Sequence, residues 1–255
     1  MRNRIALVLE IGVPVLLVGL WWLVSRVSDS FYLTPLDKIA VAFGYNWFSE
    51  RLITDVLPSL YRLLAGFGLS AVLGIGLGMA AGSVWWIARL LEPIAAFLRA
   101  VPAPALLPFA VALFGIGDEM KIFLIVMVCV WPILLNTTEG FTGVDRTMVE
   151  TARSFRVGHG PLLLRVLLPA ALPRIMAGLR TALSLAVITM VISELVGSTN
   201  GIGFFVLQAQ RSFALADMWS GIVLLGIIGY LLNLAFERLE RRVVGWQHAS
   251  RGAAA

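Results

Sequence analysis

Long stretches without a charged residue constrain this chain more than any other feature of its sequence. Leu63–Gly82 and Met218–Phe236 contain no Asp, Glu, Lys or Arg. About 20 apolar residues in a helix are enough to cross the hydrocarbon core of a bilayer, which is roughly 30 Å thick. The chain is also 59% hydrophobic and only 14% charged, whereas soluble domains average about 45–50% apolar and about 25% charged residues. The sequence therefore predicts an all-α, multi-pass membrane protein.

Six segments are predicted as membrane spans, and a single transmembrane domain, residues 1–255, accounts for the whole chain. The six segments are Ile5–Val24, Leu63–Gly82, Val101–Gly117, Ile122–Thr138, Ala170–Val196 and Met218–Phe236. The competing interpretation of the first segment is a secretory signal peptide. Its far end, Trp21-Trp22-Leu23-Val24, is bulky rather than a small-residue cleavage site, so we expect a retained helix.

Small residues recur along one of these segments. Within Leu63–Gly82, the residues Ser70, Gly74, Gly78 and Gly82 follow one another at four-residue spacing. Residues four apart lie on one face of a helix, and small side chains there let a neighbouring backbone approach closely. The pattern predicts tight helix packing within the bundle.

The basic residues predict the orientation of the chain. Six spans place both termini on one side, and if that side is the cytoplasm, most of the Lys and Arg residues face it, as the positive-inside rule requires. These residues are Arg2 and Arg4; Arg89 and Arg99; Arg146, Arg153, Arg156, Arg165, Arg174 and Arg180; and Arg238, Arg241, Arg242 and Arg251. Both termini are therefore predicted to be cytoplasmic (N-in, C-in). The net charge of +5 reflects this distribution and does not indicate nucleic-acid binding, because no basic face is interleaved with aromatic residues.

The sequence lacks the patterns of several kinds of site. Cys129 is the single cysteine, so no disulfide framework is expected. His159 and His248 have no Cys or carboxylate neighbours at ligand spacing, so no metal site is expected either. No G-x-x-x-x-G-K-[ST] occurs, and if ATP drives this protein another chain must bind it.

Carboxylates inside the predicted spans are too few for an intramembrane enzyme. Only Glu10 and Glu194 lie there, near opposite faces, and no span contains a histidine, whereas catalysis needs convergent groups at one depth. No catalytic residue is therefore expected. Transport remains, with two alternatives open at this point: an ATP-driven permease with a separate motor, or a secondary transporter not driven by ATP.

A hydrophilic stretch on the predicted cytoplasmic side, Glu139–Pro169, is longer than a connection between two spans requires. Thr147-Met148-Val149-Glu150 fits the S/T-x-x-E capping box, which predicts a short helix from Thr147. Gly158 offers a stop, and Pro161 suits the first turn of a following helix. Such a helix would lie across the membrane surface, either docking on a partner protein through Phe155 or lying among lipid headgroups.

The residues of this stretch resemble a known family. Glu150-Thr151-Ala152, followed by Val166-Leu167-Leu168-Pro169-Ala170-Ala171-Leu172-Pro173, resembles the "EAA" motif of ATP-binding-cassette (ABC) importer permeases. The resemblance extends to Val101-Pro102-Ala103-Pro104-Ala105-Leu106-Leu107-Pro108, Phe114-Gly115-Ile116-Gly117 and Ser193-Glu194-Leu195-Val196-Gly197. It covers roughly Leu57 to Trp246 and is closest to the branch that imports sulfonates, taurine, nitrate and similar small anions.

This resemblance implies the fold and the partners of the chain. The fold would be the type I ABC importer transmembrane domain, with residues 58–246 as its core and residues 145–160 forming a cytoplasmic coupling helix. The partners would be a second permease copy, two cytoplasmic ATPase subunits that bind ATP and Mg, and an extracytoplasmic solute-binding protein, in the inner membrane of a bacterium. The residues expected to dock on the ATPase are Glu150, Thr151, Ala152, Arg153, Ser154, Phe155, Arg156 and Gly158.

One position departs from the family pattern, which has glycine where this chain has Arg156. A side chain disfavours the left-handed backbone that often ends a helix. We therefore expect the helix to continue toward Val157 and to stop at Gly158, with Arg156 as a cation near its C-terminus.

Polar and proline residues inside the spans mark a candidate substrate path. The prolines Pro102, Pro104 and Pro108 break the helix entering the third span, which is tolerated only where protein or a water-filled cavity covers the break. This predicts a cytoplasmic gate at Val101–Pro108. Asn136 is a candidate hydrogen-bond donor along the path, or it bonds to a neighbouring helix. Glu194 is a candidate organiser of the external gate, or a partner for a helix end.

Overall fold

The computed structural model describes residues 4–28 and 32–252, and the side chains of residues 12–28 and 32–245. All regular secondary structure in these ranges is helical. The side chain of Glu10, one of the two carboxylates expected within spans, lies outside the described side chains. The all-α prediction is confirmed.

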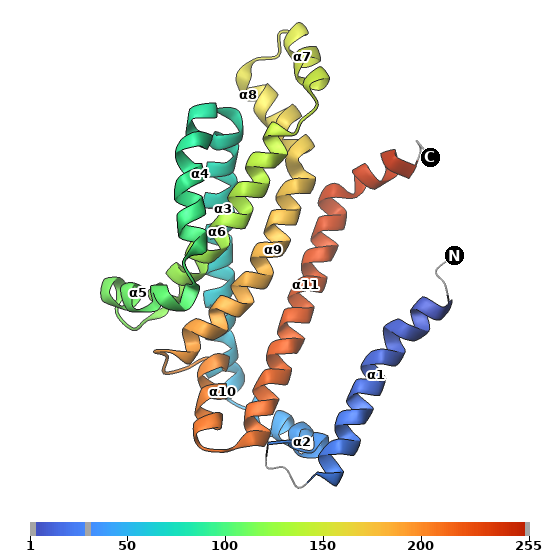
Figure 1. Ribbon diagram of the computed structural model, residues 1–255, viewed down its shortest axis with the longest axis vertical. Coiled ribbons are helices and arrows are strands. Elements are labelled where there is room, and N and C mark those ends of the chain that lie inside the picture. Colours follow the sequence, from blue (N-terminus) through green and yellow to red (C-terminus); the bar gives the residue numbers. More distant parts are fainter. Residues whose placement is uncertain (1–3, 29–31, 253–255) are drawn as a thin grey trace.

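Four long helices form the body of the molecule (Figure 1). They are α3 (Leu57–Ser83), α6 (Asp118–Thr142), α9 (Leu168–Leu195) and α11 (Leu215–Gly252). Each belongs to a helix that is long and apolar enough to cross a membrane. Buried aliphatic side chains such as Leu63, Ile133 and Met190 pack between them.

The small-residue face of α3 packs on α6, which confirms the predicted tight packing. A Cβ atom added to Gly74 would lie 2.7 Å from Ile133 Cβ, and one added to Gly78 would lie 2.5 Å from Thr137 Cβ. These two backbones are therefore as close as glycine permits, and α6 is held between α3 and α9.

A bent helix pair replaces the straight third span that the sequence predicted. The long helix of this region is α4 (Trp85–Ala100), not Val101–Gly117, and it is followed by the 3-10 turn η2 (Ala103–Leu106) and the short α5 (Leu107–Phe114). The two parts are bent by 96°. The prediction missed α4 because its charges, Arg89, Glu92 and Arg99, divide the apolar run. Counted as one span, this pair is the fifth candidate beside the four long helices.

The remaining expected span is α1 (Arg4–Val27), which stands beside the body and meets it at one end (Figure 1). Its described apolar part, Gly12–Val27, is shorter than a full span. At its far end, the ring of Trp21 packs edge-on against Trp219 of α11, with 4.6 Å between ring centroids. The adjacent α2 (Leu36–Trp47) is fixed to α11 by a 2.7 Å hydrogen bond from Asn46 Nδ2 to Asp217 Oδ1.

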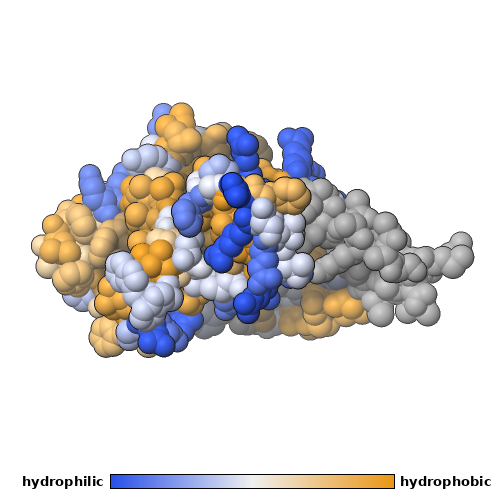
Figure 2. Space-filling view, turned by 90° about the horizontal axis from the view of Figure 1, so that it is seen from above, coloured by the Kyte–Doolittle hydropathy of each residue, from blue (hydrophilic) through white to orange (hydrophobic). Residues whose placement is uncertain are grey.

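The two ends of the molecule differ in what they carry. α2 and α10 (Ile202–Arg211) lie at one end, and α7 (Arg146–Ser154) and α8 (His159–Leu162) lie at the other (Figure 1). α1 begins, and α11 ends, on the side away from α2 and α10. Seen from the α7 end, hydrophilic side chains gather over part of the surface and hydrophobic ones border them (Figure 2). This arrangement agrees with the prediction that both termini lie on the same side of the membrane as the loop that carries α7 and α8.

Candidate functional site

The N-cap of α7 lies two residues before the position predicted from the capping box. It is Asp145, whose Oδ1 accepts a 2.8 Å hydrogen bond from the backbone N–H of Thr147. Such a cap stabilises a helix by about 1 kcal/mol. The predicted Thr147–Glu150 box is therefore wrong. The Glu150 carboxylate instead accepts from Arg146 Nε at 2.8 Å, one turn along the helix.

The end of α7 also differs from the prediction. The helix ends at Ser154, and Arg156 has φ +53°, so the helix does not continue to Gly158. The Val157 N–H donates to the Ala152 carbonyl at 3.1 Å, and the Arg156 N–H donates to the Arg153 carbonyl at 2.8 Å. This is the Schellman pattern, in which the last free carbonyls of a helix are satisfied around a left-handed residue. Arg156 therefore takes the conformation that suits the family's glycine, at a cost of roughly 1–2 kcal/mol.

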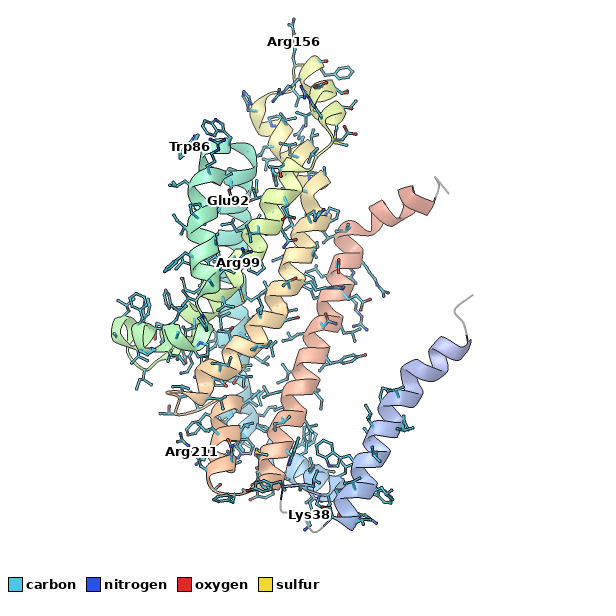
Figure 3. The ribbon with its side chains drawn as sticks, in the orientation of Figure 1. Lys38, Trp86, Glu92, Arg99, Arg156 and Arg211 are labelled. Atoms are coloured by element: carbon cyan, nitrogen blue, oxygen red, sulfur yellow. The ribbon has the colours of Figure 1, made fainter. Side chains whose placement is uncertain are left out.

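The predicted ATPase-coupling residues lie together on this exposed element. Glu150, Thr151, Arg153, Ser154, Arg156 and Gly158 are exposed, and Ala152 is half-buried. The Phe155 side chain is 80% exposed although it is a large aromatic group. Figure 3 shows Arg156 pointing away from the bundle at its extreme end. An exposed aromatic flanked by cations is typical of a protein-docking surface.

The other face of α7 rests on the bundle. Val149 and Arg153 border a hollow of about 900 Å³, whose other walls include Phe141 of α6 and Leu163. Leu163 belongs to a continuous helix from His159 to Leu195, which joins α8 to α9. α7 is thus followed, after a short loop, by a membrane-crossing helix.

The predicted gate segment forms the bend between α4 and α5. Pro102 is extended, with φ −62° and ψ 135°, directly after α4 ends at Ala100. Pro104 lies in η2, and Pro108 lies in the first turn of α5, where the missing N–H of proline is tolerated. The bend lies between the two ends of the molecule (Figure 1), and its role as a gate stays a prediction.

A cavity of about 620 Å³ lies beside this bend. Its walls come from α4, η2, α6 and α9, and they include Pro102 and Asn136. Asn136 is therefore the one polar residue of the predicted path that meets the bend, and its Nδ2 donates to the Pro132 carbonyl at 2.8 Å. Pro104, Pro108 and Glu194 do not line the cavity.

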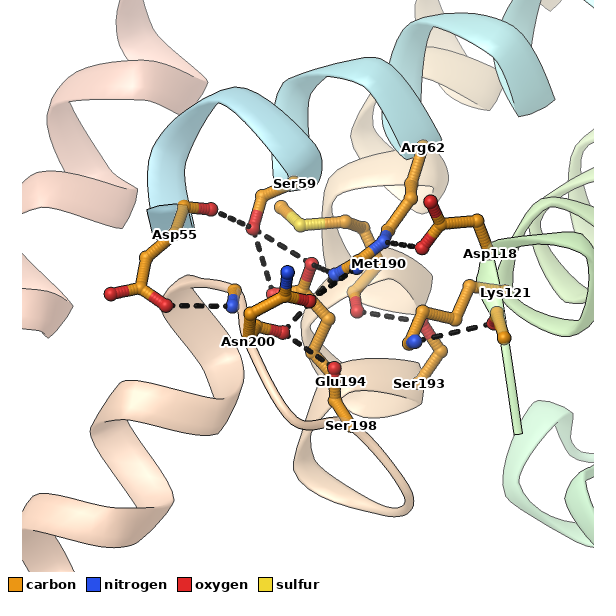
Figure 4. A network of polar contacts seen from close by, with 12 residues as sticks. Asp55, Ser59, Arg62, Asp118, Lys121, Met190, Ser193, Glu194, Ser198 and Asn200 are labelled. Carbon is orange, nitrogen blue, oxygen red and sulfur yellow. Dashed lines mark hydrogen bonds and ion pairs between the residues drawn. The ribbon is translucent and has the colours of Figure 1, made fainter. Parts of the chain in front are cut away.

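Glu194 belongs to a buried polar network at the opposite end of the bundle (Figure 4). Its side chain is 0% exposed. It accepts hydrogen bonds from Arg62 Nη1 at 2.8 Å, from Ser59 Oγ at 2.7 Å and from the Gly203 N–H at 2.9 Å. The carboxylate therefore ties the end of α9 to α3 and to the start of α10.

Arg62 is the central cation of this network, and sequence reasoning missed its role. Besides Glu194, its Nε donates to Asp118 Oδ1 at 2.7 Å, and its Nη2 donates to Asn200 Oδ1 at 2.6 Å. The loop between α9 and α10 requires glycine at position 201. Gly201 has φ +116°, and a Cβ added to it would lie 2.5 Å from the Glu194 carboxyl carbon. The sequence signal that could have revealed this network is a single basic residue in one apolar helix, Arg62 of α3, and a single acidic residue near the end of another, Glu194 of α9.

The structure offers little for a metal ion. Among the residues it describes, no group of three or more His, Cys, Asp or Glu side chains is placed to hold one. Cys129 is buried in the core, with its thiol 3.2 Å from the Ala182 carbonyl. The exposed α7 loop and the cavity at the bend therefore remain the candidate sites.

Comparisons with known proteins agree with these features. Residues 72–245 match the family described as the binding-protein-dependent transport system inner membrane component. The chain is 30% identical over 254 residues to a Bacillus subtilis protein named as an aliphatic sulfonates transport permease, SsuC, covering 98% of this chain and 92% of the relative. It is 32% identical to the Escherichia coli taurine transport system permease protein TauC, covering 93% and 89%.

Among solved structures, a chain of the inward-facing MetNI methionine ABC transporter matches with a TM-score of 0.62 at 21% identity, covering 76% of this chain and 99% of that one. The likeness shows the predicted type I importer fold. Taken together with the match over residues 72–245, it means that this protein belongs to the family of binding-protein-dependent transport system inner membrane components, the permeases of ABC importers.

Proposed function

We propose that this chain forms the translocation path of an ATP-driven importer for a small anionic solute of the sulfonate, taurine or nitrate kind. An extracytoplasmic binding protein would deliver the solute, and two cytoplasmic ATPase subunits would supply the energy. Two copies of the chain would pair in the inner membrane of a bacterium, with the α7 end in the cytoplasm. The names of SsuC and TauC support the solute class, because both state sulfonate-type cargo.

The observation that carries this proposal is the exposed α7 surface. Phe155 projects beyond the membrane-crossing helices with its side chain 80% exposed, and nothing within the described chain covers it. A large apolar group is left exposed at such cost where a partner covers it. The ATPase is the partner that a permease of this family requires.

The mechanism follows from how α7 is joined to the bundle. Closure of the two ATPases would draw the paired α7 helices together, and the continuous His159–Leu195 helix would carry this motion through the membrane. The path would then open outward to receive solute, and ATP hydrolysis would return it toward the cytoplasm. The chain itself would be non-catalytic and would bind no cofactor.

Co-purification tests the proposal. The tagged chain is extracted gently from native membranes as wild type and as Glu150→Arg, and the accompanying proteins are identified. Glu150 pairs with Arg146 on the surface of α7, so reversal of its charge removes that pair and places two cations on the docking face. We expect an ATPase subunit in about equal amount with the wild type and its loss from the variant.

The matched control is Glu50→Arg, a charge reversal at an exposed residue near α2, at the other end of the molecule. This variant is expected to retain the ATPase. If no ATPase accompanies the wild type, the proposal fails and a secondary transporter takes its place.

A further inference from the structure

Arg99 is an unusual charge for its position. It lies in the last turn of α4, immediately before the bend, and it borders the 620 Å³ cavity. Figure 3 shows it between the α7 end and the α10 end of the molecule, at the depth of the membrane-crossing helices, so it does not lie with the cytoplasmic basic residues among which the sequence predicts it. Within the part of the chain that the structure describes, no carboxylate pairs with it. A cation at this depth is costly and typically faces a substrate pathway.

A second donor in the same wall also lacks an acceptor. Trp131 of α6 lines the cavity, and its side chain is only 9% exposed. Its indole Nε1–H is the single buried side-chain donor without a hydrogen-bond partner among the described residues. Leaving a buried donor unsatisfied costs about 1–3 kcal/mol. The Nε1 atom has almost no accessible surface, so it faces the packed side of the cavity wall rather than the cavity.

Two other polar groups around the cavity are already satisfied. Thr181 Oγ1 donates to the Ala177 carbonyl at 3.1 Å. Glu139, the carboxylate of the lining, pairs with Arg174 at 3.3 Å. The guanidinium of Arg99 is thus the accessible cationic donor left for a guest.

The remaining walls are largely apolar and suit a small organic group. They include Leu98, Met127, Leu135, Leu185 and Ile188. The volume of about 620 Å³ lies within the roughly 300–1,000 Å³ typical of small-molecule sites. A charged head with a short apolar body fits these walls better than a fully hydrated inorganic ion.

We propose that this cavity is a transient binding site for small organic anions, in which Arg99 holds a sulfonate or carboxylate head. The inference rests on the proposed importer function and adds the residue that selects for negative charge inside the membrane. Guanidinium groups bind such planar or tetrahedral oxyanions through two parallel hydrogen bonds. Selectivity is then set within the path as well as by the binding protein.

A cysteine reporter tests the charge of the cavity directly. Ala103→Cys places a thiol in the cavity wall, in the full chain within membrane vesicles and in a Cys129→Ala background. Its rates of modification by an anionic ethylsulfonate thiosulfonate reagent and by a cationic ammonium reagent are compared. We expect the anionic-to-cationic rate ratio to fall about tenfold when Arg99→Gln is added, because the nearby charge is removed.

Arg89→Gln is the matched control, since Arg89 lies on the same helix but stacks over Trp85, 5.0 Å from the ring centroid, at the α7 end. It should leave the ratio unchanged. Ethanesulfonate should slow modification when Arg99 is present, and this protection should be lost in Arg99→Gln. An unchanged ratio in Arg99→Gln, or an introduced thiol that neither reagent modifies, would overturn the proposal.

A measurement of solute uptake distinguishes a failure of this inference from a failure of the proposed importer function. In vesicles containing the assembled importer, Arg99→Gln should lower ethanesulfonate uptake at least tenfold while the ATPase subunit still co-purifies, and Arg99→Lys should restore part of the uptake. Wild-type uptake in the variant would contradict the inference alone. An absence of ATPase from the wild-type preparation would contradict the importer function instead, whatever the reagent ratio shows.

Discussion

At the scale of single residues, the buried pair of Arg62 and Glu194 governs one end of the bundle. Their side chains are 3% and 0% exposed, and 2.8 Å separates Arg62 Nη1 from Glu194 Oε1. Burial of two charges is tolerated here because nearly every donor and acceptor is satisfied, with Ser59 and Asn200 completing the set. The loop from α9 to α10 is therefore held firmly against α3.

Removal of one charge from this pair should be costly. Glu194→Gln leaves the Arg62 guanidinium buried with only the half-exposed Asp118 carboxylate as counter-charge. We expect a loss of about 3–5 kcal/mol of stability, measured as a fall in the apparent melting temperature of the detergent-solubilised protein.

The matched change at an exposed pair is Glu139→Gln, whose partner Arg174 is 65% exposed. Its effect should be below about 1 kcal/mol. Equal melting temperatures for the two variants would show that the buried network is not a stabilising feature.

At the scale of elements, the contact between α3 and α6 depends on the absence of side chains. α3 presents glycines at four-residue intervals, and β-branched residues of α6, Ile133 and Thr137, fill the space above them. Lipid offers apolar helices no hydrophobic driving force for association, so close backbone approach and van der Waals contact supply it. This interface fixes the central helix against which α9 packs.

A single methyl group should disturb this interface. In Gly78→Ala the new Cβ would lie 2.5 Å from Thr137 Cβ and 2.7 Å from the Leu134 carbonyl oxygen. Overpacking of this kind costs about 1–3 kcal/mol, visible as a lower melting temperature and less monodisperse protein. Gly76→Ala adds the same atom where nothing lies within 4 Å, and it should have little effect. A stable Gly78→Ala variant would show that the two helices separate easily.

At the scale of the whole molecule, the two ends carry different features. The α7 end carries the exposed loop with Phe155, and the other end carries the buried network together with the amphipathic α2 and α10 (Figures 1 and 4). Arg99, which borders the cavity, lies between them (Figure 3). This order suits a path with a motor on one side and solute delivery on the other.

Site-directed labelling tests which end faces the cytoplasm. Lys38→Cys lies on the exposed surface of α2, and Arg146→Cys lies on α7, where the native side chain is 91% exposed. In intact spheroplasts a membrane-impermeant thiol reagent should label the first variant, and it should label the second only after lysis. The buried Cys129 serves as the unlabelled background. The reverse labelling pattern would place the docking loop outside the cell and remove it from any cytoplasmic ATPase.

Much of the architecture could be predicted from the sequence because each apolar segment becomes a helix in lipid independently of the rest of the chain. An uncharged run of some 20 residues, such as Leu63–Gly82, lowers its free energy in lipid as a helix whatever its neighbours are. The small-residue face of α3 and the exposed loop at Glu150 are local patterns of the same kind. Residue spacing alone determined the spans without internal charges and the presence of a surface helix.

Other features needed the tertiary structure because they join residues that lie far apart in the chain. Arg62 and Glu194 are 132 positions apart, and only the packing of α3 on α9 brings their charges together. The bend at Pro102 is stable because α6 and α9 surround it, which no local pattern records. Arg156 takes a left-handed backbone at the end of α7 in spite of the local preference for glycine there. The sequence by itself therefore determined the spans that have no internal charge, and only the tertiary structure decided the α4–α5 pair and where the buried charges and the cavity lie.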